Sequence, residues 1–269
     1  MIKPNQDIGK SPGRGSSGGT RILITGASGN LGGELARQLS REGVYLSLWG
    51  RDLARLDAIA RECRAAGAEV LTRSLDLSDI TAARAALGKE DSDRPFDMVM
   101  LAAGLGDTRS PGQIVEDAAL VERLGMANFV APAVLAAEAA DRMARRGRGR
   151  IGIVGTAAAS HSLPFAAAYS GSKAGLARFA DALRLAVKGH GVTVTLVSPG
   201  FFAARAGQGN APVRPGEIPA GIVAARMIEA VAQGRPELVT PWPFAVLDVF
   251  SRFLPQPLRD RILLSLRQP

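Results

Sequence analysis

The sequence predicts an α/β fold in which helices cover both faces of a doubly wound, mostly parallel sheet. Short apolar runs alternate along the chain with segments whose apolar residues repeat at helical spacing. The clearest pair lies in residues 21–39, where the apolar run Ile22 to Ile24 is followed by a Gly-rich stretch and then by Leu31, Leu35 and Leu39. A run without alternation is typical of a strand buried on both faces. The length of 269 residues is compatible with one domain of this class.

The Gly-rich stretch between this strand and this helix predicts a dinucleotide-binding turn. Its glycines allow a tight turn and the close approach of a pyrophosphate, and the N–H groups of the helix N-terminus attract the anion. The alternative is an ordinary Gly-rich loop. The turn makes the predicted fold one of the Rossmann type. The residues expected to contact the cofactor here are Gly26, Ser28, Gly29, Asn30, Leu31 and Gly32.

The end of the second predicted strand, Val44 to Trp49, bears on the choice of cofactor. An acidic residue there would bind the ribose of NAD, whereas an arginine pairs with the 2′-phosphate of NADP. Arg51 follows the strand, so the sequence favours NADP, with NAD as the alternative. Asp52 is either the N-cap of the next helix or the ribose ligand.

The third and fourth predicted strands, 69–75 and 97–101, end in further candidate cofactor contacts. Asp76 is either a turn residue or an adenine contact, and Asp79 is expected to cap a short helix before a polar connection at 88–95. Small residues after the fourth strand let the backbone lie against a ligand. The cofactor set at these two ends is Asp76, Leu77, Ala102, Ala103 and Gly104.

The segment 151–173 carries the candidate chemistry. A fifth strand, Ile151 to Val154, leads to Thr156, and Tyr169 and Lys173 follow at a spacing that places both on one face of a helix. A neighbouring ammonium lowers the pKa of a phenol, which makes the tyrosine usable for proton transfer near neutral pH. Upstream, Asn128 lies inside a helical pattern from about 114 to 143 with a possible break near residue 131, and is either a surface residue or a polar group placed for a purpose.

These motifs together resemble the short-chain dehydrogenase/reductase superfamily, in its single-domain branch. The resemblance extends from about residue 21 to residue 241. It rests on the Gly-rich turn at 25–32, Asp76, Ala103 and Gly104, Asn128, Thr156, Pro164, Tyr169, Lys173, and the run Ser198, Pro199 and Gly200 after a sixth strand.

The resemblance implies a nicotinamide cofactor and a role for each catalytic candidate. Tyr169 would be the general acid in carbonyl reduction or the base in alcohol oxidation, and Lys173 would hold the nicotinamide ribose and lower the tyrosine pKa. Thr156 would bind the substrate oxygen, and Asn128 would anchor a proton-relay water. Pro199 and Gly200 join the cofactor contacts, and no metal ligands are expected.

The chain departs from the family pattern at several positions. Thr156 replaces the usual serine, and Leu101 and Ala102 replace two asparagines whose hydrogen bonds tie the central strand to its neighbours. Asn30 stands where a glycine is usual and is expected to tolerate a positive φ. Ala204 replaces a threonine that contacts the carboxamide of nicotinamide.

The substrate region is expected to be apolar. A Gly- and Pro-containing segment at about 201–219 is predicted to be a lid over the site. Aromatic residues near it line the pocket for a hydrophobic carbonyl compound or alcohol, or else they are lid and core packing. The candidate substrate residues are His161, Phe165, Phe201 and Phe202, and the alternative for His161 is that it merely lies on the loop.

Both ends of the chain differ in character from the predicted domain of residues 21–269. Residues 1–20 form a Gly- and Ser-rich arm expected to be flexible. Residues 241–266 are basic and amphipathic, and are expected to pack on the cleft or on another subunit of a homodimer or homotetramer in preference to a membrane surface.

Composition is that of a cytoplasmic enzyme. The net charge of +8 suits an anionic partner such as a phosphorylated cofactor, but the arginines at 142–150 are not interleaved with aromatic residues, and no nucleic-acid partner is expected. Cys63, the single cysteine, allows no intrachain disulfide. No uninterrupted apolar run has the length of a membrane span.

The function predicted is hydride transfer between NADP and a carbonyl or secondary-alcohol carbon of an apolar small molecule. Two alternatives remain open: an NAD-linked alcohol dehydrogenase, and a low-turnover NADP-binding sensor or scaffold.

Overall fold

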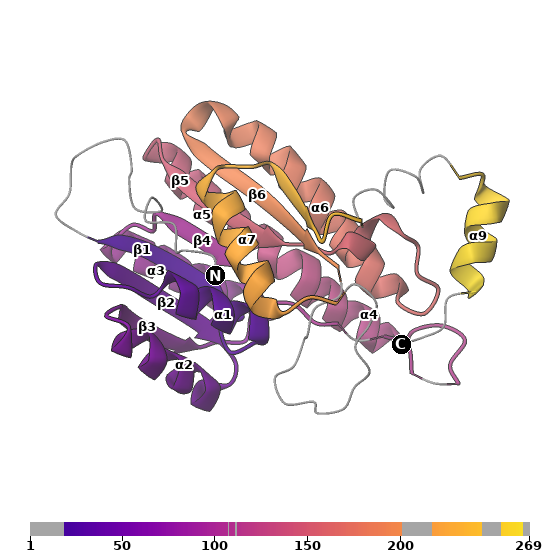
Figure 1. Ribbon diagram of the computed structural model, residues 1–269, viewed down its shortest axis with the longest axis horizontal. Coiled ribbons are helices and arrows are strands. Elements are labelled where there is room, and N and C mark those ends of the chain that lie inside the picture. The colour runs from indigo at the N-terminus through magenta and orange to yellow at the C-terminus, as the bar shows by residue number, and fades with distance from the viewer. Residues whose placement is uncertain (1–18, 107, 111, 201–216, 244–253, 266–269) are drawn as a thin grey trace.

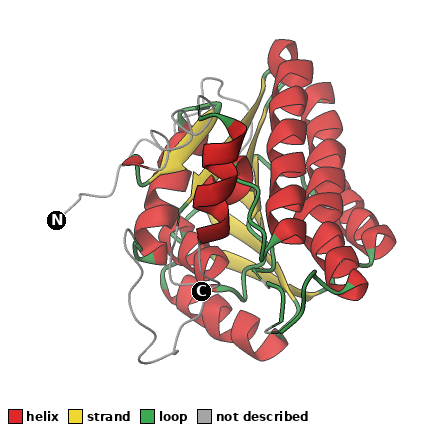
Figure 2. Ribbon diagram, turned by 90° about the vertical axis from the view of Figure 1, so that its right-hand side faces the viewer, coloured by secondary structure: helices red, strands yellow, loops and turns green. Residues whose placement is uncertain are grey.

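The computed structural model describes residues 19–106, 108–110, 112–200, 217–243 and 254–265. These residues form a seven-stranded sheet with the strand order β3-β2-β1-β4-β5-β6-β7, and every neighbouring pair is parallel. Figure 1 shows this sheet, and Figure 2 shows helices on both of its sides. The strands are β1 (Thr20–Thr25), β2 (Val44–Gly50), β3 (Glu69–Ser74), β4 (Met98–Leu101), β5 (Gly149–Val154), β6 (Val192–Pro199) and β7 (Glu237–Thr240).

The strand order reverses direction between β1 and β4, which are neighbours although β2 and β3 lie between them in sequence. In open α/β sheets, ligands bind at such a switch point, outside the carboxyl ends of the strands. The predicted doubly wound, single-domain fold is therefore confirmed, and its topology places the site at the ends of β1, β4 and β5.

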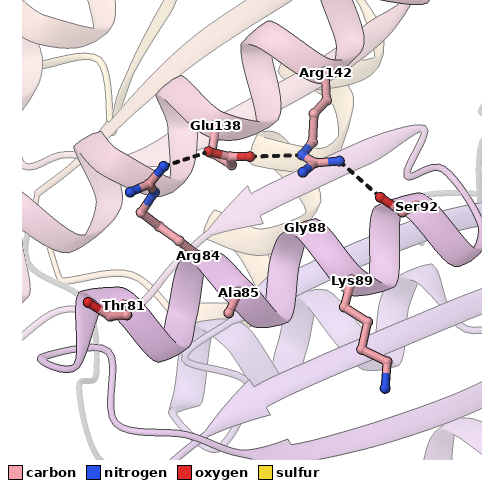
Figure 3. A pocket seen from close by; sticks show the side chains of 8 residues that line it. All are labelled: Thr81, Arg84, Ala85, Gly88, Lys89, Ser92, Glu138 and Arg142. Carbon is pink, nitrogen blue, oxygen red and sulfur yellow. Dashed lines mark hydrogen bonds and ion pairs between the residues drawn. The ribbon is translucent and has the colours of Figure 1, made fainter.

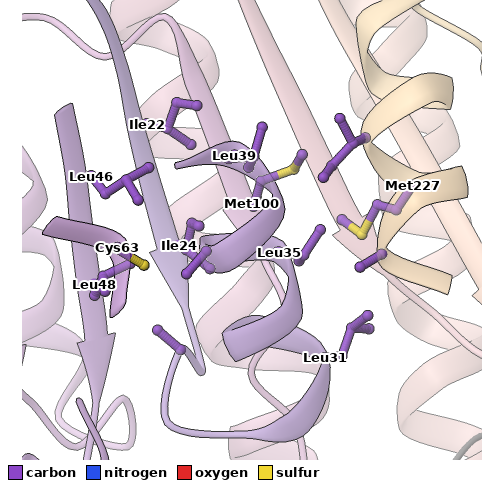
Figure 4. Packing of buried hydrophobic residues seen from close by; sticks show 14 of the residues in the cluster. Ile22, Ile24, Leu31, Leu35, Leu39, Leu46, Leu48, Cys63, Met100 and Met227 are labelled. Carbon is purple, nitrogen blue, oxygen red and sulfur yellow. The ribbon is translucent and has the colours of Figure 1, made fainter. Parts of the chain in front are cut away.

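The helices divide between the two faces of the sheet. One face is covered by α1 (Asn30–Leu39), α2 (Leu53–Ala65) and α7 (Ala220–Ala232), and the other by α3 (Ile80–Asp93), α5 (Ala131–Arg145) and α6 (Ala167–Val187). Each face has its own apolar core. Figure 4 shows the core under α1, where Leu31, Leu35 and Leu39 meet Ile22 and Ile24 of β1. Cys63 is fully buried in this core, which agrees with its place in the helical pattern.

One sequence prediction about the fold is wrong: residues 88–93 are not a polar connection, because α3 continues to Asp93. Two of the polar residues that suggested a loop, Glu90 and Asp91, lie on the buried side of this helix. Glu90 accepts a hydrogen bond of 2.6 Å from Ser47 and pairs with Arg73 at 2.7 Å, and Asp91 pairs with Arg146 at 2.6 Å. Partners on distant elements thus compensate the burial of these carboxylates.

The chain is helical without interruption from Ala118 to Arg145. The break that the sequence predicts near residue 131 is a change of helix type and does not end the helix. The run consists of α4 (Ala118–Gly125), a π-helical turn η2 (Met126–Val130) and α5, with Pro132 in the first turn of α5. It is long and apolar enough to cross a membrane by length and composition. Eight residues of α5 are buried, and this part packs as a core helix against β4 and β5.

The C-terminal region ends in α9 (Gln256–Ser265), which Figure 1 shows in yellow, apart from the helix layers. Leu263 is buried, whereas Leu258, Ile262 and Leu264 are exposed. The arm at 1–18, the predicted lid over residues 201–216 and the segment 244–253 lie outside the described residues.

Candidate active site

The glycine turn between β1 and α1 requires residues without side chains. Gly26 has a φ of +69°, and a Cβ there would lie 2.7 Å from the Cα of Ala103. The amide of Gly29 donates to the carbonyl oxygen of Gly26 over 2.9 Å and closes the turn. A Cβ at Gly32 would overlap the same carbonyl oxygen. The turn therefore brings its backbone against the end of β4.

The N-terminus of α1 presents backbone N–H groups without a side-chain cap. Gly29 is the N-cap residue and has no side chain that could cap the helix, and no acidic residue lies in its first turn. Asn30 is the first residue of α1, so the expected positive φ at this position is wrong: the left-handed conformation lies at Gly26. An open, uncapped helix terminus is a suitable site for an anion. Leu31 is buried beneath it and anchors the helix.

The end of β2 lies beside the glycine turn. A Cβ at Gly50 would lie 2.6 Å from the Oγ of Ser28, so only a glycine leaves room there for this serine. Arg51 follows and is exposed. Asp52 is the N-cap of α2 and accepts from the amide of Arg55 at 3.0 Å. The structure therefore supports the interpretation of Asp52 as the N-cap of the helix over its interpretation as the ribose ligand.

The end of β3 forms a turn. Asp76 is exposed and accepts from the amide of Ser78 at 2.9 Å, and this backbone hydrogen bond lowers the pKa of its carboxyl. Arg51 also contributes to that lowering, so its guanidinium lies near Asp76. Leu77 packs partly buried on the core under α5. Asp79 caps α3 through the amide of Ala82 at 2.9 Å, as predicted.

Apolar side chains occupy the two positions at the end of β4 where the family resemblance would place asparagines. Leu101 is buried on one face of the sheet and Ala102 packs against the core on the other. The amide of Ala103 donates to the Oγ1 of Thr25 at 3.4 Å, so one polar tie to β1 remains. Gly104 is exposed, and a Cβ there would lie 3.0 Å from the Oδ1 of Asn128.

Asn128 is fully buried in the π-helical turn and holds the segment after β4. Its Oδ1 accepts from the amide of Leu105 at 2.8 Å, and its Nδ2 donates to the Leu105 carbonyl oxygen at 2.9 Å. The interpretation of Asn128 as a surface residue is therefore excluded. A π-helical turn inside a helix frequently occurs at a functional site.

Tyr169 lies in the first turn of α6 and shares a hydrogen bond with Thr156, which follows β5. Burial raises the pKa of the Tyr169 phenol, and the hydrogen bond to Thr156 lowers it by less. The sequence prediction that Lys173 lowers this pKa therefore differs from the structure, in which burial and the Thr156 hydroxyl set the pKa of the phenol. In the protein without cofactor the phenol is protonated at neutral pH.

Lys173 lies one turn further along α6 and is almost completely buried. Its Nζ donates to the carbonyl oxygen of Val154 at 2.9 Å. Burial lowers the pKa of this lysine to about 8, because the charged form loses its hydration. The predicted spacing therefore places Tyr169 and Lys173 in one site, with the ammonium directed at the end of β5.

The end of β6 completes the site. Thr156 donates from its Oγ1 to the Pro199 carbonyl oxygen at 3.5 Å, and the amide of Gly200 donates to the Thr240 carbonyl oxygen at 2.8 Å. These contacts bring the ends of β5, β6 and β7 together.

Of the candidate substrate residues, His161 and Phe165 are half-buried in the segment before α6. The Phe165 carbonyl oxygen accepts from the amide of Arg109 at 3.0 Å, so this segment is joined to the loop after β4. Phe201, Phe202 and Ala204 lie outside the described residues.

Two residues of this region escaped sequence reasoning. Leu105 is held by hydrogen bonds from its backbone to Asn128, and a contact of the backbone cannot be recognised from the type of residue. Glu116 accepts from the amide of Ala168 at 2.7 Å, from a position 52 residues earlier in the chain. The sequence shows only that Glu116 is an acidic residue shortly before the start of a helix. This position would have predicted that Glu116 caps α4, the adjacent helix, and not α6.

A groove between α3 and α5 lies away from this site, and its two arginines, Arg84 and Arg142, are paired. Figure 3 shows Glu138 between Arg84 and Arg142, at 3.4 and 2.9 Å, while Arg142 also reaches Ser92. In the described part of the chain, His, Cys, Asp and Glu form no group of three that could hold a metal ion.

Comparisons with known proteins agree with this fold. The short chain dehydrogenase family model matches residues 20–212. An uncharacterized oxidoreductase of Myxococcus xanthus is 32% identical over 246 residues, which cover 91% of this chain and 96% of the relative. The bulky-bulky ketone specific alcohol dehydrogenase from Comamonas testosteroni, at 22% identity, shares the fold with a TM-score of 0.75, covering 93% of this chain and 95% of its own.

A short-chain dehydrogenase from Sphingobium yanoikuyae, solved in complex with NADPH, is 25% identical with a TM-score of 0.75, and the match covers 93% of this chain and 97% of its own. With the family model matched over most of the chain and a relative matched over nearly its full length, this chain belongs to the short-chain dehydrogenase family of oxidoreductases.

Proposed function

We propose that this chain is an NADP-dependent reductase that transfers a hydride to the carbonyl carbon of an apolar small molecule, or from the corresponding secondary alcohol. The proposal is carried by the hydrogen-bonded pair of Tyr169 and Thr156, with the buried Lys173 one turn away. All three lie at the edge of the sheet where the open N-terminus of α1 lies, because the carboxyl ends of parallel strands meet there.

The residues at this edge fit a nicotinamide dinucleotide. The uncapped N-terminus of α1 and the close backbone approach at Gly26 suit a pyrophosphate. Bound there, the cofactor would supply or accept the hydride. The residues that would hold it are Gly26, Ser28, Gly29, Asn30, Leu31, Gly32, Arg51, Asp76, Leu77, Ala102, Ala103, Gly104, Pro199 and Gly200.

Tyr169 would donate a proton to the carbonyl oxygen during reduction. Because burial raises the pKa of its phenol, Tyr169 carries at neutral pH the proton that this step requires. The Thr156 hydroxyl would bind the same oxygen and orient it towards the phenol. Lys173 would hold the nicotinamide ribose, and Asn128 would fix the loop after β4 that borders the cofactor and help to anchor a proton-relay water.

Preference for NADP over NAD rests on the end of β2. Arg51 is exposed there and is available for a 2′-phosphate, whereas the carboxylate of Asp52 is engaged in the α2 cap. The NADPH complex of the Sphingobium yanoikuyae relative supports the same preference.

The experiment is a fluorescence titration of the purified protein with NADPH and, separately, NADH. We expect tighter binding of NADPH, and a loss of about tenfold in Arg51→Ala that leaves NADH binding unchanged. Arg55→Ala, which removes another exposed arginine from α2, is the matched control. Equal affinities in the wild type would refute the NADP preference, and NADPH binding without turnover of any ketone would leave the sensor or scaffold alternative.

We also propose that the chain works in the cytoplasm as a homodimer or homotetramer. The exposed Leu258, Ile262 and Leu264 on α9 support a second copy as the partner of this helix. Light scattering should show an oligomer that Ile262→Glu weakens, whereas binding of the protein to anionic vesicles would favour a membrane instead.

A further inference from the structure

The N-terminus of α6 lacks a cap of its own. The N-cap residue is Ala166, whose side chain has no acceptor atom, and no side chain at that position caps the helix. The first N–H groups of a helix have no partner within it. Tyr169 is the third residue of α6, so its position depends on how this unsupported first turn is held.

Glu116 supplies the missing acceptor from the loop after β4. Its Oε2 accepts from the amide of Ala168, the residue before Tyr169, at 2.7 Å. The other carboxylate oxygen, Oε1, is buried. A carboxylate is favoured at a helix N-terminus because it faces the positive end of the helix dipole, and its charge shortens the hydrogen bond.

The next residue, Asp117, performs the corresponding task for another helix. Its Oδ1 accepts from the amide of Ala119 at 2.9 Å and caps α4, which begins the helical run that carries Asn128. Two consecutive carboxylates therefore hold the starts of both helices that carry catalytic candidates. Elsewhere in the loop, the amide of Arg109 donates to the Phe165 carbonyl oxygen at 3.0 Å, a second tie to the segment before α6.

We propose that Glu116 is a positioning residue for Tyr169. By capping α6 it fixes the first turn of the helix and holds the phenol against Thr156. The proposal rests on the proposed function, in which this phenol transfers the proton. A small displacement of a reacting group lowers the rate of the chemical step more than it changes substrate binding.

The test compares Glu116→Ala with Glu116→Gln, whose amide oxygen can accept the same hydrogen bond. We expect the alanine variant to lower kcat for NADPH-dependent ketone reduction by about tenfold with KM nearly unchanged, and glutamine to restore most of the rate. Asp181→Ala is the matched control, because it removes an exposed carboxylate that pairs with Arg184 in the far half of the same helix and should leave kcat unchanged. In a Tyr169→Phe background, Glu116→Ala should cause no further loss.

Hydrogen exchange makes the test independent of turnover. In Glu116→Ala the amides of Ala168 and Tyr169 should exchange faster than in the wild type, and glutamine should restore their protection. Unchanged protection, or a kcat within twofold of the wild type, would overturn the proposal. A wild-type protein that reduces no ketone with NADPH would refute the proposed function, while the exchange data would still decide whether Glu116 holds the turn that carries Tyr169.

Discussion

Lys173 donates a hydrogen bond from its Nζ to the carbonyl oxygen of Val154 over 2.9 Å, and so ties α6 to the end of β5. This bond does not offset the cost of burying an ammonium group, because burial lowers the pKa of Lys173 to about 8. Lys173, which the proposed chemistry requires, therefore lowers the stability of the folded protein. Active sites commonly combine useful chemistry with such a cost.

Lys173→Met should stabilise the protein at neutral pH and abolish turnover. The folded-state pKa of about 8 lies below the ordinary lysine value of 10.5, so the unfolded state binds more protons between these values. The cost of burial is full below pH 8 and declines as pH rises towards 10.5. Urea denaturation should show a gain of up to about 3 kcal/mol at pH 7 that shrinks towards pH 10.

The exposed Lys188, just beyond the same helix, provides the control for this experiment. Lys188→Met should change the free energy of unfolding by less than about 0.5 kcal/mol at any pH. A gain in Lys173→Met that stayed constant from pH 7 to pH 10 would contradict a lowered lysine pKa.

Tyr169 should titrate above the ordinary range of a tyrosine when no cofactor is bound. The chain has only two tyrosines, so in a Tyr45→Phe background the tyrosinate absorbance reports Tyr169 alone. Burial raises the pKa of this phenol, and the Thr156 hydroxyl lowers it. Thr156→Val should therefore raise the pKa further, whereas Thr156→Ser should leave it near the wild-type value. A midpoint below pH 9 would show that a cation controls the phenol after all.

Much of the fold was predictable because local patterns and the tertiary structure agree. The apolar runs became buried parallel strands, and the residues Asp52 and Asp79 cap helices where a capping residue was expected. The prediction failed where distant partners override the pattern. Glu90 suggested a loop because its partners Ser47 and Arg73 lie on other elements and have no trace in the local sequence.

The candidate site shows the same division. Side chains such as Tyr169 and Lys173 were found from type and spacing, since their chemistry requires particular groups. Contacts made through the backbone, such as that of Leu105, and caps supplied across the fold, such as Glu116, follow only from the three-dimensional structure.

Gly26→Ala should destabilise the protein and disrupt cofactor binding. The substitution meets two costs, a positive φ of +69° and a Cβ only 2.7 Å from the Cα of Ala103, which is backbone and cannot move aside alone. Gly147 has the same φ, but a Cβ there has no heavy atom within 4 Å. Gly147→Ala should cost about 1 kcal/mol and Gly26→Ala at least about 3 kcal/mol, as measured by chemical denaturation. An equal loss of stability in the two variants would show that the glycine turn can move away from β4 to make room for the added Cβ.

Asn128→Ala should lower both stability and turnover, because it leaves the amide and the carbonyl oxygen of Leu105 without their partner. Asn128 is fully buried and makes both hydrogen bonds, at 2.8 and 2.9 Å, so the cost should be about 2–4 kcal/mol. Gln38→Ala is the control, because this exposed amide donates one hydrogen bond, to the Gly221 carbonyl oxygen, and should cost less than about 1 kcal/mol.

Asn128→Asp should not rescue the loss, since a carboxylate accepts from the Leu105 amide but repels the Leu105 carbonyl oxygen. Full rescue by aspartate, measured by denaturation and by ketone reduction, would mean that only the bond to the amide matters.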